Sequence, residues 1–203
     1  MDLLGDLSGK LIVAMPAMRD PRFAHSVILI CAHSDEGAMG LIVNKPVPDF
    51  SFWELLSQLK ITPKDAGRDI RVHFGGPVER GRGFVLHSSD YVSGSSGGGA
   101  TTQVRGGYGM TATLDVLGAL ARGAGPKQAL LALGYAGWGA GQLEAEIARN
   151  DWLVADPAED LIFSAKDSGK WSGALRHMGS TPCCCRPAPE GPEVWPEVWH
   201  LPG

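Results

Sequence analysis

The chain of 203 residues has a formal net charge of −4, from 18 Lys and Arg against 22 Asp and Glu. Its length allows a core that buries roughly two-thirds of the unfolded surface, so folding needs neither a disulfide nor a metal. The acidic balance lacks the basic character of proteins that bind nucleic acid or anionic membranes. Glycine accounts for 28 residues, roughly twice its usual share, which predicts a globular domain with many tight turns.

Three apolar runs near the N-terminus predict strands, at residues 10–15, 27–32 and 40–44. The first run ends at Pro16, because proline supplies no N–H to a sheet ladder. Residues 33–37 have turn composition and a length that joins antiparallel strands. The second and third runs should therefore form a hairpin, and both look buried on two faces.

A capping box marks the first predicted helix. Ser51 stands three residues before Glu54, the spacing at which each side chain bonds the other residue's backbone N–H. The helix should end near Lys60, ahead of a proline. Its core-facing side consists of three leucines: Leu55, Leu56 and Leu59.

The middle of the chain predicts strands separated by loops. Residues 70–74 alternate apolar with polar side chains, which indicates a half-buried strand. Residues 83–87 should pair with it across the loop 75–82. Residues 94–99, Gly-Ser-Ser-Gly-Gly-Gly, have the composition of a flexible surface loop. Thr and Val within 101–105 favour a further strand.

Helices and strands alternate in the predicted C-terminal half. Thr113 should cap a helix over residues 114–122 that ends at Gly123. Residues 129–133 fit a buried strand or a buried helix, and strand is favoured because a glycine-rich segment follows at 134–139. The remaining predicted elements are a helix at 141–149, a strand at 152–154 and a helix at 170–177.

The chain changes character beyond residue 179. Residues 180–203 contain several prolines, three consecutive cysteines and the sequence Pro-Glu-Val-Trp written twice. Neither helix nor strand periodicity survives there. We therefore expect one domain over residues 1–179 and an irregular, disordered tail over 180–203.

The N-terminus does not have the composition of a secretory signal. Two acids precede the first base, Lys10, which reverses the usual charge order. No apolar run reaches the ~18 residues needed to span a bilayer. Cys31 lies inside an apolar run and is interpreted as a buried thiol. A cytoplasmic location is expected.

Two glycine-rich segments are candidate binding sites. Gly75 and Gly76, followed by Pro77, stand at a strand end where backbone N–H groups could face an anion; the alternative is a turn that needs positive φ. Residues 134–146 connect a strand to a helix, so the helix N-terminus could meet an anion or carbonyl. Its polar lining would be Tyr135, Trp138, Gln142 and Glu144, which equally suit core and cap roles.

The sequence indicates neither a metal centre, nor a cofactor, nor a catalytic nucleophile. Cys31 and His33 would share one strand face, but two ligands do not complete a tetrahedral site. Two His-Ser neighbours occur, yet adjacent strand residues face opposite sides, so neither serine has a ready base. These neighbours are His25-Ser26 and His87-Ser88.

A helix-turn-helix fits residues 114–133 by length alone. Its second half is almost entirely Ala and Leu, whereas a recognition helix presents polar and basic side chains to base edges. The basic residues between 60 and 82 are offset by acids, which is typical of a solvated face. Direct contact with DNA is not favoured.

Eight segments carry a family resemblance: residues 14–16, 20–23, 26–31, 36–46, 75–78, 83–87, 134–138 and 142–144. In this order they resemble the YqgE/AlgH family of bacterial proteins, also called UPF0301 or DUF179, over roughly residues 7–179. The resemblance implies a compact cytoplasmic α+β protein without established catalytic residues. Some members carry a transcriptional-regulator label through alginate regulation. The tail beyond residue 179 departs from the family pattern.

The expected fold is α+β, a single domain with a mixed, mostly antiparallel twisted sheet that is barrel-like in curvature and flanked by helices. The leading hypothesis is a non-enzymatic regulatory or accessory protein that acts through a ligand or protein partner. The alternatives are an enzyme that binds a small molecule or nucleotide in a glycine-rich cleft, and a DNA-binding transcriptional regulator. The candidate surface comprises Asn44, Gly75, Gly76, Pro77, His87, Tyr135, Trp138, Gln142 and Glu144.

Overall fold

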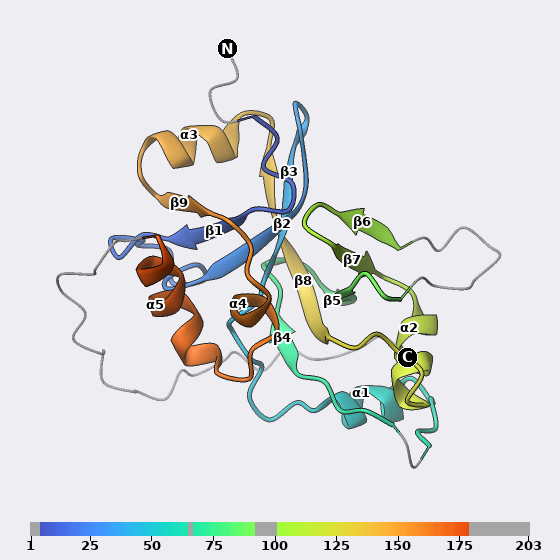
Figure 1. Ribbon diagram of the computed structural model, residues 1–203. Coiled ribbons are helices and arrows are strands. Elements are labelled where there is room, and N and C mark those ends of the chain that lie inside the picture. The colour runs from blue at the N-terminus through green and yellow to red at the C-terminus, as the bar shows by residue number, and fades with distance from the viewer. Residues whose placement is uncertain (1–4, 65–66, 92–100, 179–203) are drawn as a thin grey trace.

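The structure, a computed structural model, describes residues 5–64, 67–91 and 101–178 (Figure 1). These residues form one α+β domain, in which a curled, mostly antiparallel sheet is accompanied by five helices. The predicted fold class is confirmed. The expected loop at 94–99 and the expected tail at 180–203 lie outside the described residues.

The sheet has the strand order β6-β7-β5-β8-β3-β2-β1-β9, and β4 pairs with β8 beside this path. The strands are β1 Leu11–Ala14, β2 Val27–Ser34, β3 Gly37–Ile42, β4 Val72–Phe74, β5 Val78–Ser88, β6 Thr102–Val104, β7 Tyr108–Thr111, β8 Ala129–Gly139 and β9 Trp152–Ala155. Figure 1 shows β1 and β9 on one side of β8 and β6 and β7 on the other. The sheet thus has two wings that meet at β8.

The helices are α1 Phe52–Gln58, α2 Leu114–Ala121, α3 Gln142–Ala148, α4 Glu159–Phe163 and α5 Asp167–His177. Helix α4 and strand β7 were not predicted from the sequence. With five residues, α4 is too short to show a helical period. Strand β7 reads Tyr-Gly-Met-Thr and is buried throughout, so it has no polar alternation to reveal it.

The predicted hairpin of β2 and β3 is confirmed. The two strands are antiparallel, with Ser34 opposite Gly37, so the turn consists of residues 35 and 36 alone. It is shorter than expected because the ladder extends to the end of β2. The first five residues of β2 are buried, as its uninterrupted apolar sequence predicts.

Strand β8 is longer than predicted and forms the centre of the sheet. Residues 134–139, expected as a connection, continue the strand to Gly139. Strand β5 pairs mainly with the first half of β8 and β3 with its second half. Gly134 has φ 72°, a conformation that lets the strand bend at its middle without a Cβ clash.

The expected pairing of residues 70–74 with 83–87 is wrong. The stretch from Leu131 to Leu133 of β8 pairs with β4 in parallel and with β5 in antiparallel orientation. One strand can do so only if its two neighbours occupy opposite edges, so β4 and β5 are separated by β8. His73, a polar residue of the predicted alternation, is buried, and its Nε2 lies 3.1 Å from the Asp167 carboxylate of α5.

Helix α1 begins as predicted, at the capping box. The Ser51 Oγ accepts from the Glu54 N–H at 3.2 Å, and the Ser51 N–H donates to the Glu54 carboxylate at 2.7 Å. The expectation that Leu59 points into the core is wrong, since its exposed fraction is 37%. The helix ends at Gln58, and Leu59 follows as its C-cap, turned away from the face that buries Phe52.

The capping box gives a direct test of local stability. Ser51→Ala removes the acceptor of the Glu54 N–H, and we expect the free energy of unfolding to fall by about 1 kcal/mol. Urea denaturation followed by tryptophan fluorescence measures this. The control is Ser57→Ala. Ser57 lies on the exposed face of the same helix and is not its N-cap, so its replacement should leave stability unchanged or slightly higher. Equal losses in both variants would contradict the capping role.

Candidate functional site

The two glycine-rich segments of the sequence meet in the structure as closely packed backbone. A Cβ on Gly75 would lie 2.2 Å from the Gly134 carbonyl oxygen, and one on Gly76 would lie 2.1 Å from the Tyr135 carbonyl carbon. The Gly75 N–H donates to the Leu133 carbonyl at 2.8 Å. These glycines permit the chain to cross β8, which supports the turn interpretation over a ligand cradle.

Asn44 extends the pairing between β2 and β3 beyond the end of β3. Its amide oxygen accepts from the Val27 N–H at 2.8 Å, and its amide nitrogen donates to the His25 carbonyl at 2.8 Å. The side chain thereby satisfies both a donor and an acceptor of the neighbouring backbone. Its contacts are those of a structural bridge.

His87 is fully buried between β5 and β7. Its Nδ1 lies 2.9 Å from the Ser88 carbonyl, and its Nε2 lies 2.9 Å from the Thr111 hydroxyl. A Cβ on Gly109 would approach the ring to 2.4 Å, so glycine makes the space for the imidazole. Burial lowers the pKa of His87, since it disfavours the charged ring.

The candidate residues near α3 are joined by hydrogen bonds that hold this helix on the sheet. Glu144 contacts the His33 ring at 2.6 Å. Glu146 accepts from the indole N–H of Trp138 at 2.9 Å, from that of Trp152 at 2.8 Å and from the Gln142 amide at 2.9 Å. The sequence did not single out Glu146, although it lies within the candidate segment 134–146 and collects these donors.

The structure does not bring the nine predicted surface residues together. His87 lies opposite Ala129 at the start of β8, whereas Gln142 follows Gly139 at its end. Ten strand steps, about 33 Å measured along the strand, lie between those ends. Tyr135 packs edge-on against Phe84 between them, with ring centroids 5.9 Å apart. Asn44, His87 and the α3 residues therefore belong to three separate neighbourhoods.

A buried ionic cluster around Asp167 was not predicted. The Asp167 carboxylate contacts Arg71, the His73 Nε2 at 3.1 Å and the Lys170 ammonium at 2.8 Å. Lys170 also donates to the Val43 carbonyl at 2.7 Å and the Ile162 carbonyl at 2.8 Å. The cluster ties α5 to the sheet. Its members lie far apart in sequence, so no local pattern could reveal it.

Burial and hydrogen bonding act in opposite directions on these groups. Burial alone would raise the pKa of Asp167, but the bonds from His73 and Lys170 outweigh it and hold that pKa well below its usual range. Burial lowers the pKa of Lys170, and its contacts with Asp167 oppose that effect. The ion pair is thus maintained inside the protein by mutual contact.

An apolar groove lies between α1 and α2, over β5 and β8. Its volume is about 210 Å³. Its floor includes Val85, Leu131 and Leu133, and its rim includes Leu59 and Leu114. Leu114 has an exposed fraction of 58%. Sequence reasoning missed this groove because it assigned Leu59 to the core.

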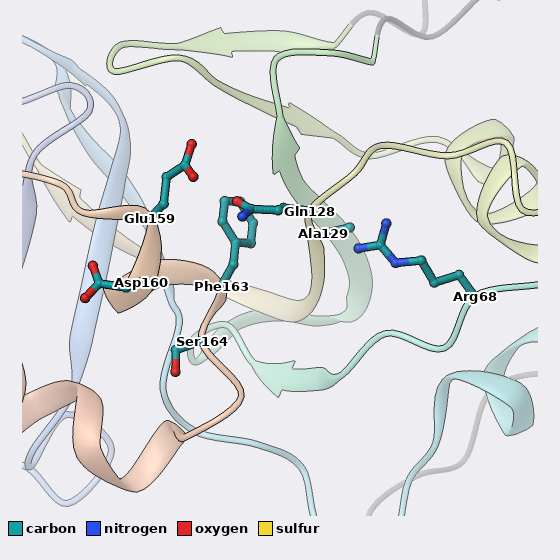
Figure 2. A pocket seen from close by; sticks show the side chains of 7 residues that line it. All are labelled: Arg68, Gln128, Ala129, Glu159, Asp160, Phe163 and Ser164. Atoms are coloured by element: carbon teal, nitrogen blue, oxygen red, sulfur yellow. The ribbon is translucent and has the colours of Figure 1, made fainter.

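A second, more polar pocket of about 480 Å³ lies between α4 and the start of β8 (Figure 2). Arg68 borders it at one end and the carboxylates of Glu159 and Asp160 at the other. Its remaining lining residues are Gln128, Ala129, Phe163 and Ser164. None of these residues was singled out from the sequence as part of a site.

Within the described ranges, no group of three or more His, Cys, Asp or Glu residues is placed to hold a metal ion. Burial raises the pKa of Cys31 to about 12, which keeps its thiol protonated and unreactive. The cysteines at 183–185 lie outside the described residues. Among the residues that the structure describes, no helix is long and apolar enough to cross a membrane.

These features define a single-domain α+β protein whose half-barrel sheet carries an apolar groove and a polar pocket on its flanks. A family model described as DUF179, AlgH-like, matches residues 11–183, and the chain belongs to this family. A UPF0301 protein of Cereibacter sphaeroides is 64% identical over 177 residues, which cover 87% of this chain and 94% of the relative. One from Paracoccus denitrificans is 50% identical over 187 residues, covering 92% and 97%.

Two solved structures have a similar fold. The solution structure of the AlgH protein from Pseudomonas aeruginosa matches with a TM-score of 0.72 and 39% identity, over 87% of this chain and 90% of that one. A crystal structure of protein DIP2367 from Corynebacterium diphtheriae matches with a TM-score of 0.66 and 22% identity, over 84% and 86%. The predicted family is confirmed, and the names of these relatives state no activity.

The close packing of Gly75 and Gly76 on β8 predicts that a side chain there lowers the free energy of unfolding strongly, whereas one at a nearby open position does not. Gly76→Ala would place a Cβ against the Tyr135 backbone at a φ of 155°, and we expect it to lower the free energy of unfolding by at least about 3 kcal/mol. Gly81→Ala, within the following strand β5, meets no atom within 4 Å and should change it by less than about 0.5 kcal/mol. Urea denaturation of both variants measures the contrast, and similar stabilities would refute the crossing argument.

The Asp167 cluster predicts a pH-dependent contribution to stability. Asp167→Asn leaves the buried Lys170 ammonium without its carboxylate, and we expect a loss of about 3–5 kcal/mol in the free energy of unfolding at pH 7. Because the pKa of Asp167 is depressed in the folded state, its contribution is present above its unfolded value of 3.8 and is lost as the pH falls below it. The difference between variant and wild type should narrow there.

Asp156→Asn is the matched control for this test. Asp156 is exposed and paired with Lys10 at the surface, so its loss should change the free energy of unfolding little at any pH. Denaturant titrations of all three proteins at several pH values provide the comparison. A pH-independent difference for Asp167→Asn would contradict the assigned charge state.

Proposed function

We propose that this protein is a non-enzymatic accessory or regulatory protein that binds an apolar segment of a partner protein in the groove between α1 and α2. One observation supports this most. Among the described residues, the exposed large hydrophobic side chains are Leu59 and Leu114, and both line this groove. Isolated exposed leucines are ordinary, but two that rim one apolar groove favour an interaction surface.

The size of the groove suits a side chain better than a metabolite. Its volume of about 210 Å³ lies below the ~300 Å³ at which pockets for drug-sized ligands begin. One or two large apolar side chains of a partner could occupy it and cover Leu59 and Leu114. Full burial of a leucine contributes about 1.5–3 kcal/mol, so a few such contacts support a transient complex.

The charge of the groove specifies the partner further. Arg82 is the charged residue that lines it. Its ion pair with Glu79, at 3.2 Å, joins two half-exposed side chains and contributes little to stability. The guanidinium can therefore exchange Glu79 for a carboxylate of the partner. The expected ligand is a segment with large apolar residues next to an acid.

The two alternative functions receive less support. Residues 129–133, the second half of the possible helix-turn-helix, belong to β8, so the described residues do not form that motif there. Nucleophilic catalysis needs a hydroxyl beside a base. The Thr111 hydroxyl contacts the His87 ring, but both residues are fully buried, so a substrate cannot reach them. These placements favour binding over DNA recognition or nucleophilic catalysis at those residues.

Selection of peptides from a displayed library tests the proposal. We expect selected peptides to carry an apolar residue beside an acid. Leu114→Gln should weaken their binding about tenfold, the effect of losing about 1.4 kcal/mol of apolar contact. Arg82→Gln should weaken the acidic peptides alone. Arg149→Gln, which replaces another exposed arginine of an ion pair, is the matched control and should have no effect.

Three outcomes would contradict a partner segment in this groove. The first is a selection in which no peptide responds to Leu114→Gln. Self-association of the protein that Leu114→Gln abolishes would assign the groove to a second copy. Tighter peptide binding after removal of residues 180–203 would assign it to the chain's own segment. Sedimentation and titration of the full and shortened chains separate these outcomes.

A further inference from the structure

We propose that the polar pocket between α4 and the start of β8 binds a small molecule with a cationic amine or guanidinium group at one end and a carboxylate at the other, as in a basic amino acid. The site is distinct from the α1–α2 groove and shares no lining residue with it. Its volume of about 480 Å³ falls within the ~300–1,000 Å³ of small-molecule sites.

Three chain segments build this pocket. Helix α4 supplies Glu159, Asp160 and Phe163, Gln128 directly precedes β8, and Arg68 enters from the segment before β4 (Figure 2). In Figure 2 the two carboxylates lie on one side of Phe163 and Gln128, and the Arg68 guanidinium extends toward Ala129 on the other. Groups of opposite charge therefore border the pocket at its two ends, and the Asp160 carboxylate points away from Phe163 and Gln128.

The α4 end of the pocket is rich in acceptors that lack donors. Glu159 and Asp160 form no ion pair with any described residue. The Gln128 amide oxygen is buried and has no hydrogen-bond partner. A buried acceptor without a donor is costly, so a ligand N–H that reached it would be stabilised. An ammonium or guanidinium group supplies both the donors and the positive charge.

The middle of the pocket presents an aromatic surface. The Phe163 ring is half-buried and packs on Tyr108, with ring centroids 6.1 Å apart. Such a ring can contact the methylene stem or the cationic head of a ligand. Burial is the largest cause that raises the pKa of Tyr108, and the nearby Glu159 and Asp160 carboxylates raise it further. Their negative potential thus extends over the aromatic pair.

The opposite end can hold a carboxylate. The Arg68 Nη1 donates to the Pro126 carbonyl at 2.6 Å, which orients the guanidinium. Arg68 forms no ion pair with any described acid, and its remaining N–H groups can pair with a carboxylate. Because Arg68 does not contact Glu159 or Asp160, a ligand that spans the pocket can satisfy both ends.

The test uses L-arginine as the probe. The full chain labelled with ¹⁵N is titrated with L-arginine, with agmatine, which lacks the carboxylate, and with citrulline, in which a neutral ureido group replaces the guanidinium. We expect amide shifts from arginine around Gln128 and over residues 159–164. Agmatine and citrulline should each bind about tenfold more weakly, the effect of losing one charge-assisted contact.

Matched variants locate the contacts. Glu159→Gln with Asp160→Asn changes two exposed acids and should weaken arginine at least about tenfold. Asp35→Asn with Glu36→Gln makes the same charge change at the β2–β3 turn and should have no effect. Arg68→Gln should remove the preference for arginine over agmatine. That preference is a ratio within one variant, so it does not depend on the stability of the variant.

Three results would overturn the proposal: no shifts at millimolar arginine, shifts spread outside the pocket, or equal affinity in the two acid-substituted proteins. Leu114→Gln should leave arginine binding unchanged, because Leu114 lies in the separate groove. Failure at one site is therefore distinguishable from failure at the other.

Discussion

The crossing of the chain over β8 at Gly75 and Gly76 is the constraint on which the rest of the structure depends. It requires backbone contact that no side chain permits, since a Cβ at either position would overlap β8. The crossing places β4 and β5 on opposite edges of β8. Helix α1, which precedes β4, and helix α2, which follows β7, then share one apolar cluster with β8. The groove between these helices is a consequence of that arrangement.

Two carboxylates hold helices α3 and α5 to the other parts of the sheet. Asp167 collects contacts from Arg71, His73 and Lys170, and Glu146 collects two indole N–H groups and an amide. Many of the polar side chains that looked available for chemistry are therefore used in packing the fold. The two surfaces proposed for binding lie on the flanks, where Leu59 and Leu114 are exposed and where Glu159, Asp160 and Arg68 have no ion-pair partner among the described residues.

Local signals in the sequence predicted local structure well. The capping box at Ser51 and Glu54, the β2–β3 hairpin and the family resemblance were all confirmed. The functional surface was harder to predict, because the chosen residues were grouped by glycine content and polarity. Glycine in β8 and at the crossing serves close backbone approach, which a sequence cannot distinguish from a ligand loop. Leu59 was misplaced because the helix ends at Gln58, two residues before its predicted end at Lys60.

The sequence by itself determined the α+β class, most strands and helices and the family, because these depend on periodicity, caps and motifs within short segments. Only the tertiary structure decided which strands became neighbours, how His73 and Lys170 reached Asp167, and which side chains remained exposed around the groove and the pocket. Those features depend on contacts between residues far apart in the chain. The energy of such contacts appears only when the crossing at β8 brings the segments together.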